Sequence, residues 1–137
     1  IWREPFKKRR CLVPATAFYE WKTLDEKTKQ PFVIGLTKTA MFAFAGLWDA
    51  WKDEQDKWLQ SFSIVTIEAN ELMSQIHSRM PVILHERDYD RWLEREVTDQ
   101  PPIDLLRPFE SDLMEMHRAN NKVGNVRNNG PEMLVGD

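Results

Sequence analysis

Short apolar and aromatic runs separated by polar stretches fill the first half of the chain, and this alternation constrains the fold more than any other feature. Residues 11–22 and 31–36 are two such strand-forming regions on either side of the polar stretch 23–30. This arrangement predicts an antiparallel hairpin with a long tip. The runs 41–51 and 58–68 are joined by polar residues and predict a second hairpin.

In the second half the apolar spacing changes to that of helices. Residues 70–76 start with an asparagine, a favoured N-cap, and predict a short helix that Pro81 stops. Residues 86–96 have one apolar face and predict a second helix. Residues 113–117 predict a last strand, and the Asn- and Gly-rich residues 120–136 predict a loop. The expected class is α+β, an antiparallel sheet core with a few peripheral helices.

Length and composition favour one folded domain spanning residues 1–137. With 42% hydrophobic and 30% charged residues, the chain has enough apolar surface to offset its entropy. No apolar run approaches the roughly 20 residues needed to cross a bilayer, so no membrane partner is expected. The single Cys11 excludes an internal disulfide, and the sequence predicts no metal site and no cofactor. A reducing compartment is expected, either the bacterial cytoplasm with its nucleoid or a nucleus.

The net charge of −3 gives no overall attraction to phosphate. Binding to nucleic acid must therefore come from local basic clusters, and residues 7–10 (Lys-Lys-Arg-Arg) are the clearest one. A solvated charge run is an equally good interpretation of the charge pattern alone.

Glu20 and His77 are the two candidates for acid–base chemistry. Aromatic neighbours disfavour the charged form of Glu20, which suits a proton shuttle, although a glutamate on the polar side of an edge strand fits the pattern too. His77 precedes Pro81 by four residues, and Arg79 beside it offers an anion contact. A histidine that only caps the preceding helix is the alternative. We expect Glu20 and His77 to converge on one cleft.

Cysteine and tryptophan side chains are open to both structural and functional interpretations. Cys11, His77 and Glu20 are the residue types of a thiol peptidase, but Cys11 opens an apolar strand and is more typical of a buried residue. Trp2 and Trp21 lie beside charged residues and are candidates for base stacking. The remaining tryptophans in periodic apolar contexts are expected in the core: Trp48, Trp51, Trp58 and Trp92.

Several ordered segments together resemble the SOS response-associated peptidase (SRAP) family. Each segment alone is a weak match, but their common order across nearly the whole chain is specific. They are residues 9–15 (Arg-Arg-Cys-Leu-Val-Pro-Ala), 18–21 (Phe-Tyr-Glu-Trp), 44–48 (Phe-Ala-Gly-Leu-Trp), 66–70 (Thr-Ile-Glu-Ala-Asn), 76–84 (Ile-His-Ser-Arg-Met-Pro-Val-Ile-Leu) and 123–132.

The resemblance implies a fold, a partner and an activity. It implies a barrel-like pair of antiparallel sheets with a positively lined groove for single-stranded DNA. It also implies removal of an initiator methionine and covalent shielding of abasic sites through an N-terminal cysteine that forms a thiazolidine. By resemblance, the catalytic residues are Glu20 and His77, and the DNA-binding residues are Arg79, Thr66 and Trp21, with Arg9 and Arg10 from the basic cluster.

The sequence also departs from the family pattern. The family's Met-Cys-Gly-Arg-like start and its Asn-Ala-Arg-x-Glu-Thr-like segment both belong upstream of Ile1, so we expect the N-terminal part of the domain, with its nucleophile, to be missing. A fragment of this kind is expected to be inactive alone. Two other functions remain open, a non-covalent module for single-stranded DNA and a thiol peptidase that uses Cys11.

Overall fold

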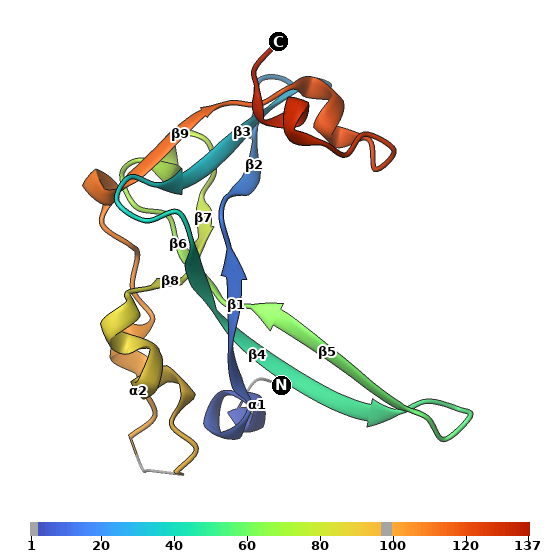
Figure 1. The fold of residues 1–137 in the computed structure, drawn as a ribbon, viewed down its shortest axis with the longest axis vertical. Helices are drawn as coiled ribbons and strands as arrows, with labels where there is room; N and C mark the ends of the chain where they lie inside the picture. The colour runs from blue at the N-terminus through green and yellow to red at the C-terminus, as the bar shows by residue number, and fades with distance from the viewer. Residues whose placement is uncertain (1–2, 97–99) are drawn as a thin grey trace.

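Two hairpins and a set of short helical turns build the molecule (Figure 1). The computed structural model describes residues 3–96 and 100–137, with only the backbone of the first two described residues. The strands are β1 (Arg10–Ala15), β2 (Phe18–Thr23), β3 (Lys29–Leu36), β4 (Phe42–Lys52), β5 (Trp58–Ile64), β6 (Thr66–Glu68), β7 (Arg79–Pro81), β8 (Ile83–Leu84) and β9 (Met114–Arg118). The α-helices are α1 (Arg3–Lys8) and α2 (Tyr89–Leu93), and the 3-10 helices are η1 (Met73–Gln75), η2 (Glu86–Asp88), η3 (Ile103–Leu105), η4 (Ser111–Leu113), η5 (Asn121–Gly124) and η6 (Pro131–Leu134).

All strand pairs are antiparallel, and they form three sheets. The first has the order β1-β4-β5, with β8 also paired to β4. The second has the order β2-β3-β9, and the third is the pair β6-β7. The hairpins β2–β3 and β4–β5 and the predicted last strand are confirmed. Residues 11–15, expected in the first hairpin, form β1 and pair with β4 instead, and residues 66–68, expected in the second, pair with β7. The α+β class is confirmed too, but across residues 3–96 and 100–137 the ladders form three separate sheets without the expected barrel-like closure.

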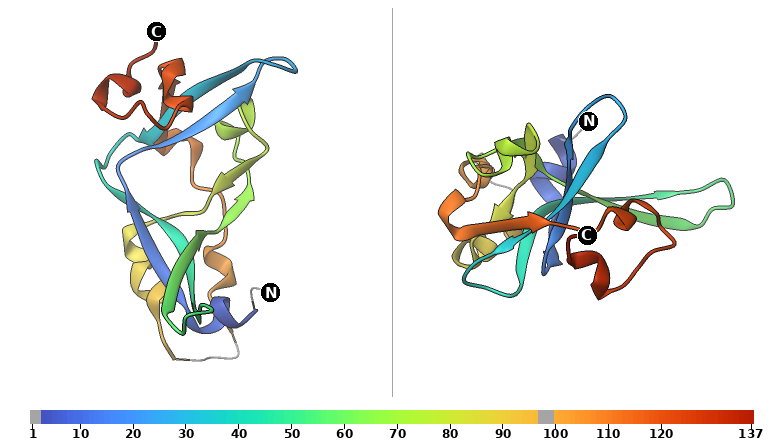
Figure 2. Two further views of the ribbon diagram at one scale, coloured as in Figure 1. Left: turned by 90° about the vertical axis from the view of Figure 1, so that its right-hand side faces the viewer. Right: turned by 90° about the horizontal axis from the view of Figure 1, so that it is seen from above.

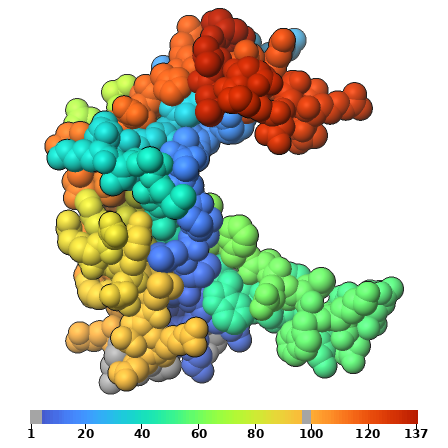
Figure 3. Space-filling view, in the orientation of Figure 1, coloured from blue at the N-terminus to red at the C-terminus, as the bar shows by residue number. Residues whose placement is uncertain are grey.

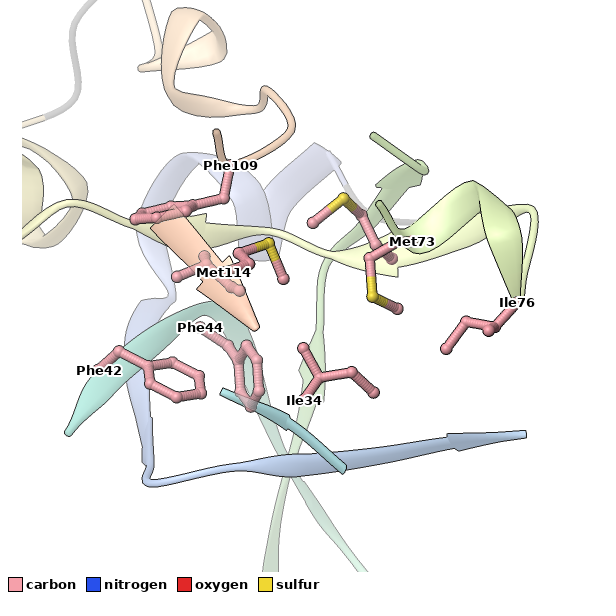
Figure 4. Close-up of a cluster of buried hydrophobic side chains, with 9 residues drawn as sticks. Ile34, Phe42, Phe44, Met73, Ile76, Phe109 and Met114 are labelled. Carbon is pink, nitrogen blue, oxygen red and sulfur yellow. The ribbon is translucent and has the colours of Figure 1, made fainter. Parts of the chain in front are cut away.

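The core consists of two adjoining clusters of buried apolar side chains. The larger one joins both hairpins to the turn that carries η1, and its members are Ile34, Phe42, Phe44, Met73, Ile76, Met80, Ile83, Phe109 and Met114 (Figure 4). Phe18, Phe42 and Phe44 pack edge to face there, with ring centroids 5.4–6.5 Å apart. The smaller cluster surrounds Trp92 under β4 and β8. Because β2, β4 and η1 share one core, they hold the candidate site residues at fixed positions.

Three local predictions about the helices were wrong. The segment 70–76 forms the 3-10 helix η1 instead of an α-helix, and it ends at Gln75. Pro81 is not its stop, because it lies within β7. The helix expected over 86–96 is shorter, with η2 leading into α2, which ends at Leu93. Its Trp92 is fully buried, while Leu93 is exposed.

The predicted burial of the tryptophans holds for only part of the set. Trp92 is buried and Trp48 is half-buried. Trp51 and Trp58 are 47% and 67% exposed, because they lie where the β4–β5 hairpin projects from the body of the molecule (Figure 2). Trp2 lies outside the described residues.

Candidate functional site

Glu20 and His77 meet although they belong to different elements. Oε1 of Glu20 lies 3.9 Å from Nε2 of His77, with the carboxylate side chain about 25% exposed and the imidazole about 41% exposed. The predicted proximity of the two side chains is therefore confirmed. At this distance one water or a small shift connects the two groups, so a proton can pass between them and a common substrate.

Strand geometry orients Glu20. On β2 the side chains alternate between two faces, and Phe18, on the same face as Glu20, packs into the larger core cluster. Oε1 of Glu20 also accepts a hydrogen bond from the backbone N–H of Trp21, at 3.0 Å. The carboxylate is thus fixed at the border between the core and solvent, on the side where His77 lies.

A capped turn positions His77. Oδ1 of Asn70 accepts from the N–H of Met73 at 2.9 Å, and the carbonyl oxygen of Met73 accepts from the N–H of His77 at 2.9 Å. The N–H of Arg79 donates to Nδ1 of His77 at 3.0 Å. Nδ1 also lies 3.0 Å from the carbonyl oxygen of Arg79, so the backbone of Arg79 fixes the ring, and Nε2 is the nitrogen that faces Glu20.

Arg79 and Thr66 form a polar pair across the β6–β7 ladder. Nη2 of Arg79 donates to the carbonyl oxygen of Thr66 at 2.9 Å and to its Oγ1 at 3.3 Å. Both residues are exposed, and Arg79 is two positions from His77. A cation and a hydroxyl held in this way beside the Glu20 and His77 pair are suited to an anionic ligand such as a phosphate.

A pocket of about 650 Å³ opens beside this pair. Arg79, Thr66 and Ser63 provide its polar lining. The rest is mainly apolar and comes from distant parts of the chain: Phe6, Leu47, Ile64, Val65, Ile103 and Leu106. No sequence signal identified these residues as members of one site, because an apolar residue in a run is equally typical of the core.

Trp21 lies on the other face of β2 from Glu20. It shares that face with Tyr19, and the two rings are 6.3 Å apart and tilted. The half-buried indole can still present its exposed part to a ligand, but from the opposite side of the strand.

The side chains of Arg9 and Arg10 are bound to other groups of the same chain, which the sequence did not predict. Arg9 pairs with Asp49 at 2.8 Å and lies over the Trp48 ring. The guanidinium of Arg10 donates to four backbone carbonyl oxygens, those of Phe6, Lys7, Trp92 and Glu94. Burial lowers the pKa of Arg10, partly offset by Glu94. Arg10 therefore joins the ends of α1 and α2.

Cys11 has the properties of a structural thiol. It is half-buried on β1 opposite Gly46, and a Cβ at position 46 would come within 2.8 Å of its Sγ. Burial raises the pKa of the Cys11 thiol. A raised pKa disfavours the thiolate that a peptidase nucleophile needs.

The residues that meet at this site are also those that carry the family resemblance. The family model for SOS response associated peptidase (SRAP) matches residues 1–126. The chain belongs to the SRAP family.

Relatives with known names and structures support the SRAP assignment. The Bacillus subtilis protein "Abasic site processing protein YoqW" is 42% identical over 133 residues, which are 96% of this chain and 59% of the relative. The rat "Abasic site processing protein HMCES" is 31% identical over 156 residues, 94% of this chain and 44% of the relative. A crystal structure of a Bacteroides thetaiotaomicron protein superposes with a TM-score of 0.88 at 30% identity, covering 98% of this chain and 60% of that chain.

This SRAP chain therefore spans about three fifths of the length of YoqW and of the Bacteroides protein. Among the described residues, no helix is long and apolar enough to cross a membrane.

Proposed function

We propose that this SRAP chain is part of a DNA-damage protein that binds single-stranded DNA and covalently shields abasic sites. The distance of 3.9 Å between Glu20 and His77 is the observation that supports this proposal most directly. The reacting residue in this proposal is an N-terminal cysteine and not Cys11. The same chemistry includes removal of an initiator methionine, which exposes that cysteine.

Shielding an abasic site requires a condensation followed by an addition. The amine of an N-terminal cysteine attacks the aldehyde carbon of the abasic sugar, and the resulting imine forms with loss of one water. The thiol of the same residue then adds to the imine carbon and closes a thiazolidine ring. Both steps move protons at the reacting nitrogen, oxygen and sulfur atoms, and paired acid and base groups accelerate such transfers about 10²- to 10⁴-fold.

Glu20 and His77 are the groups that we assign to these transfers. The carboxylate takes a proton from the cysteine amine or thiol, and the imidazole gives one to the departing hydroxyl. Arg79 and Thr66 contact the phosphates beside the abasic sugar. Trp21 stacks on a base at the other face of β2, and Arg9 contacts the DNA backbone only when it leaves Asp49.

Glu20→Ala tests the proposal in a protein that carries this chain behind a Met-Cys start. We expect methionine removal, crosslinking or both to slow about 10²-fold, measured by intact-mass spectrometry and by a denaturing gel with abasic single-stranded DNA. Glu26→Ala, in the exposed tip of the same β2–β3 hairpin, is the matched control. Wild-type rates for Glu20→Ala in both assays would make Glu20 a structural residue.

A non-covalent module for single-stranded DNA is the second candidate. The exposed Arg79 and Thr66 pair favours it, because phosphate binding does not need the missing cysteine. It predicts that the Met-Cys protein binds abasic DNA with a salt-dependent affinity but gives no covalent band.

A further inference from the structure

Strand β5 has the uncharged composition of an interior strand, but it lies at the open edge of its sheet. It ends the sheet order β1-β4-β5, and all seven of its residues are exposed. Its sequence, Trp-Leu-Gln-Ser-Phe-Ser-Ile, contains no charged residue, no proline and no glycine. Natural proteins protect open strand edges with charges, prolines or bulges, because an unprotected edge pairs with other chains. β5 has none of these side-chain devices.

Two hydrogen bonds at the ends of the β4–β5 ladder show which backbone groups face the open edge. The N–H of Asp53 donates to the oxygen of Lys57, and the N–H of Val65 donates to the oxygen of Ala45, both at 2.9 Å. The register between these bonds is continuous. In an antiparallel ladder the backbone groups of successive residues point alternately to the two sides. Residues 59, 61 and 63 therefore face β4, and residues 58, 60, 62 and 64 face outward.

The outward-facing residues also carry an apolar row on one face of the hairpin. Trp58 is 67% exposed and Phe62 is 60% exposed. Phe62 lies opposite Trp48 in the register, and both line a pocket of about 360 Å³ with Val13 and Pro14. A strand added to the β5 edge would continue this row and pack beside the exposed rings of Trp58 and Phe62.

The shape of the molecule leaves room for such an addition. The β4–β5 hairpin projects from the body on the same side as the C-terminal segment, and a broad hollow lies between them (Figure 3). The Bacteroides structure, which superposes on 98% of this chain, has about two fifths of its own length outside the match. That additional chain is long enough to supply further strands to the same fold.

We propose that β5 is an acceptor edge, which pairs with an extended strand from the part of the domain that the longer SRAP relatives carry beyond these 137 residues. An uncharged apolar edge is suited to a permanent partner of this kind, because permanent interfaces resemble a protein core. The pairing would also close one side of the larger pocket, since Ser63 and Ile64 line it beside Arg79. This inference does not depend on the chemistry proposed above.

Hydrogen exchange of the individual backbone amides tests the pairing. The β5 amides that face β4 serve as the internal control. The test compares the 137-residue chain with a chimera that also carries the unmatched residues of Bacillus subtilis YoqW at the places they occupy in that relative. We expect the amides of Gln60, Phe62 and Ile64 to exchange at least tenfold more slowly in the chimera. The amides of Leu59, Ser61 and Ser63 already face β4 and should change much less.

A proline separates edge pairing from simple contact. Gln60→Pro removes one outward-facing N–H and leaves the β4 ladder its bonds, and proline is tolerated at such edge positions. In the chimera it should restore fast exchange at Phe62 and Ile64, whereas Gln60→Ala should not. The unmatched YoqW polypeptide added in trans provides a second format if the chimera does not fold.

Every outcome decides the proposal. Protection of the even-numbered amides in either format, lost with Gln60→Pro, supports it. Protection in neither format overturns it. The same amides becoming protected in the 137-residue chain as its concentration rises would assign the edge to a second copy and overturn it too. A single-stranded oligonucleotide that shifts the Trp58 and Phe62 ring signals, without protection of the amides in either format, would assign the surface to DNA and overturn the pairing.

Discussion

Nη2 of Arg79 is anchored on Thr66 by two bonds, 2.9 Å to the carbonyl oxygen and 3.3 Å to Oγ1. The guanidinium is thereby held on an exposed ladder, two residues from His77. Because one bond goes to the backbone, Thr66→Val should leave Arg79 largely in place.

Arg79→Ala should weaken binding of single-stranded DNA by a similar factor for all sequences. The loss of one phosphate contact lowers the slope of log affinity against log salt by about 0.7 to 1 unit. Fluorescence anisotropy at several salt concentrations measures the slope. Arg91→Ala, which removes an exposed arginine bound to Asp104, is the matched control. Unchanged affinity at low salt for Arg79→Ala would remove Arg79 from the DNA interface.

Arg10→Ala should cost stability and leave DNA binding unchanged. The substitution leaves four carbonyl oxygens without their donor and removes a cation that lies 5.7 Å from the Trp92 ring. We expect the free energy of unfolding to fall by about 2 kcal/mol in urea titrations. Arg10→Lys should recover only part of it, because an ammonium lacks the planar fork. A reduced salt slope for folded Arg10→Ala would restore the DNA-binding role predicted from the sequence.

Asn70 should stabilise the turn that precedes His77 through both ends of its amide. Oδ1 caps the turn at Met73, and Nδ2 donates to the carbonyl oxygen of Phe109 at 2.6 Å. Asn70→Asp retains the cap and loses the donor, while Asn70→Ala loses both. We expect losses of about 1 and about 2 kcal/mol in the free energy of unfolding. Equal losses for the two variants would show that the cap contributes nothing.

The sequence predicted which strands pair better than it predicted which side chains are buried. Strand alternation and polar turns indicated both hairpins, and the convergence of Glu20 with His77 followed from the chemistry that both would serve. Trp51 and Trp58 were expected in the core because they lie in apolar runs. Such a run does not show whether other residues of the chain pack over it, and here both side chains are exposed. The engagement of Arg10 was not predictable either, since its acceptors are backbone carbonyl oxygens, which no side-chain pattern reveals.

Cys11 should react slowly with alkylating reagents in the folded chain. Burial raises the pKa of its thiol, so at a given pH a smaller fraction is the reactive thiolate. The pH at which iodoacetamide labelling reaches half its maximum rate should lie above that of the chain unfolded in urea. Mass spectrometry of the quenched reaction measures both profiles. Coincident profiles, or a folded profile at lower pH, would contradict a structural Cys11.

The 137-residue chain itself should not form a stable crosslink with abasic DNA, although it contains a cysteine. Ring closure to a thiazolidine needs an amine and a thiol on the same residue, and only an N-terminal cysteine has both. The nitrogen of Cys11 is in a peptide bond, so its thiol gives at most a reversible hemithioacetal with the aldehyde, and partial burial disfavours that as well. Ile1 has a free amine without a thiol, and lysines likewise form only a reversible imine.

The measurement is a denaturing gel of the purified chain after incubation with abasic single-stranded DNA and heating, without borohydride. We expect no shifted band, and we expect one once a Met-Cys start with the rest of the domain is joined to the chain. That second band should persist in Cys11→Ala, because the reacting thiol is the N-terminal one. A heat-stable band from the 137-residue chain that disappears in Cys11→Ala would instead make Cys11 the nucleophile, against both its burial and its raised pKa.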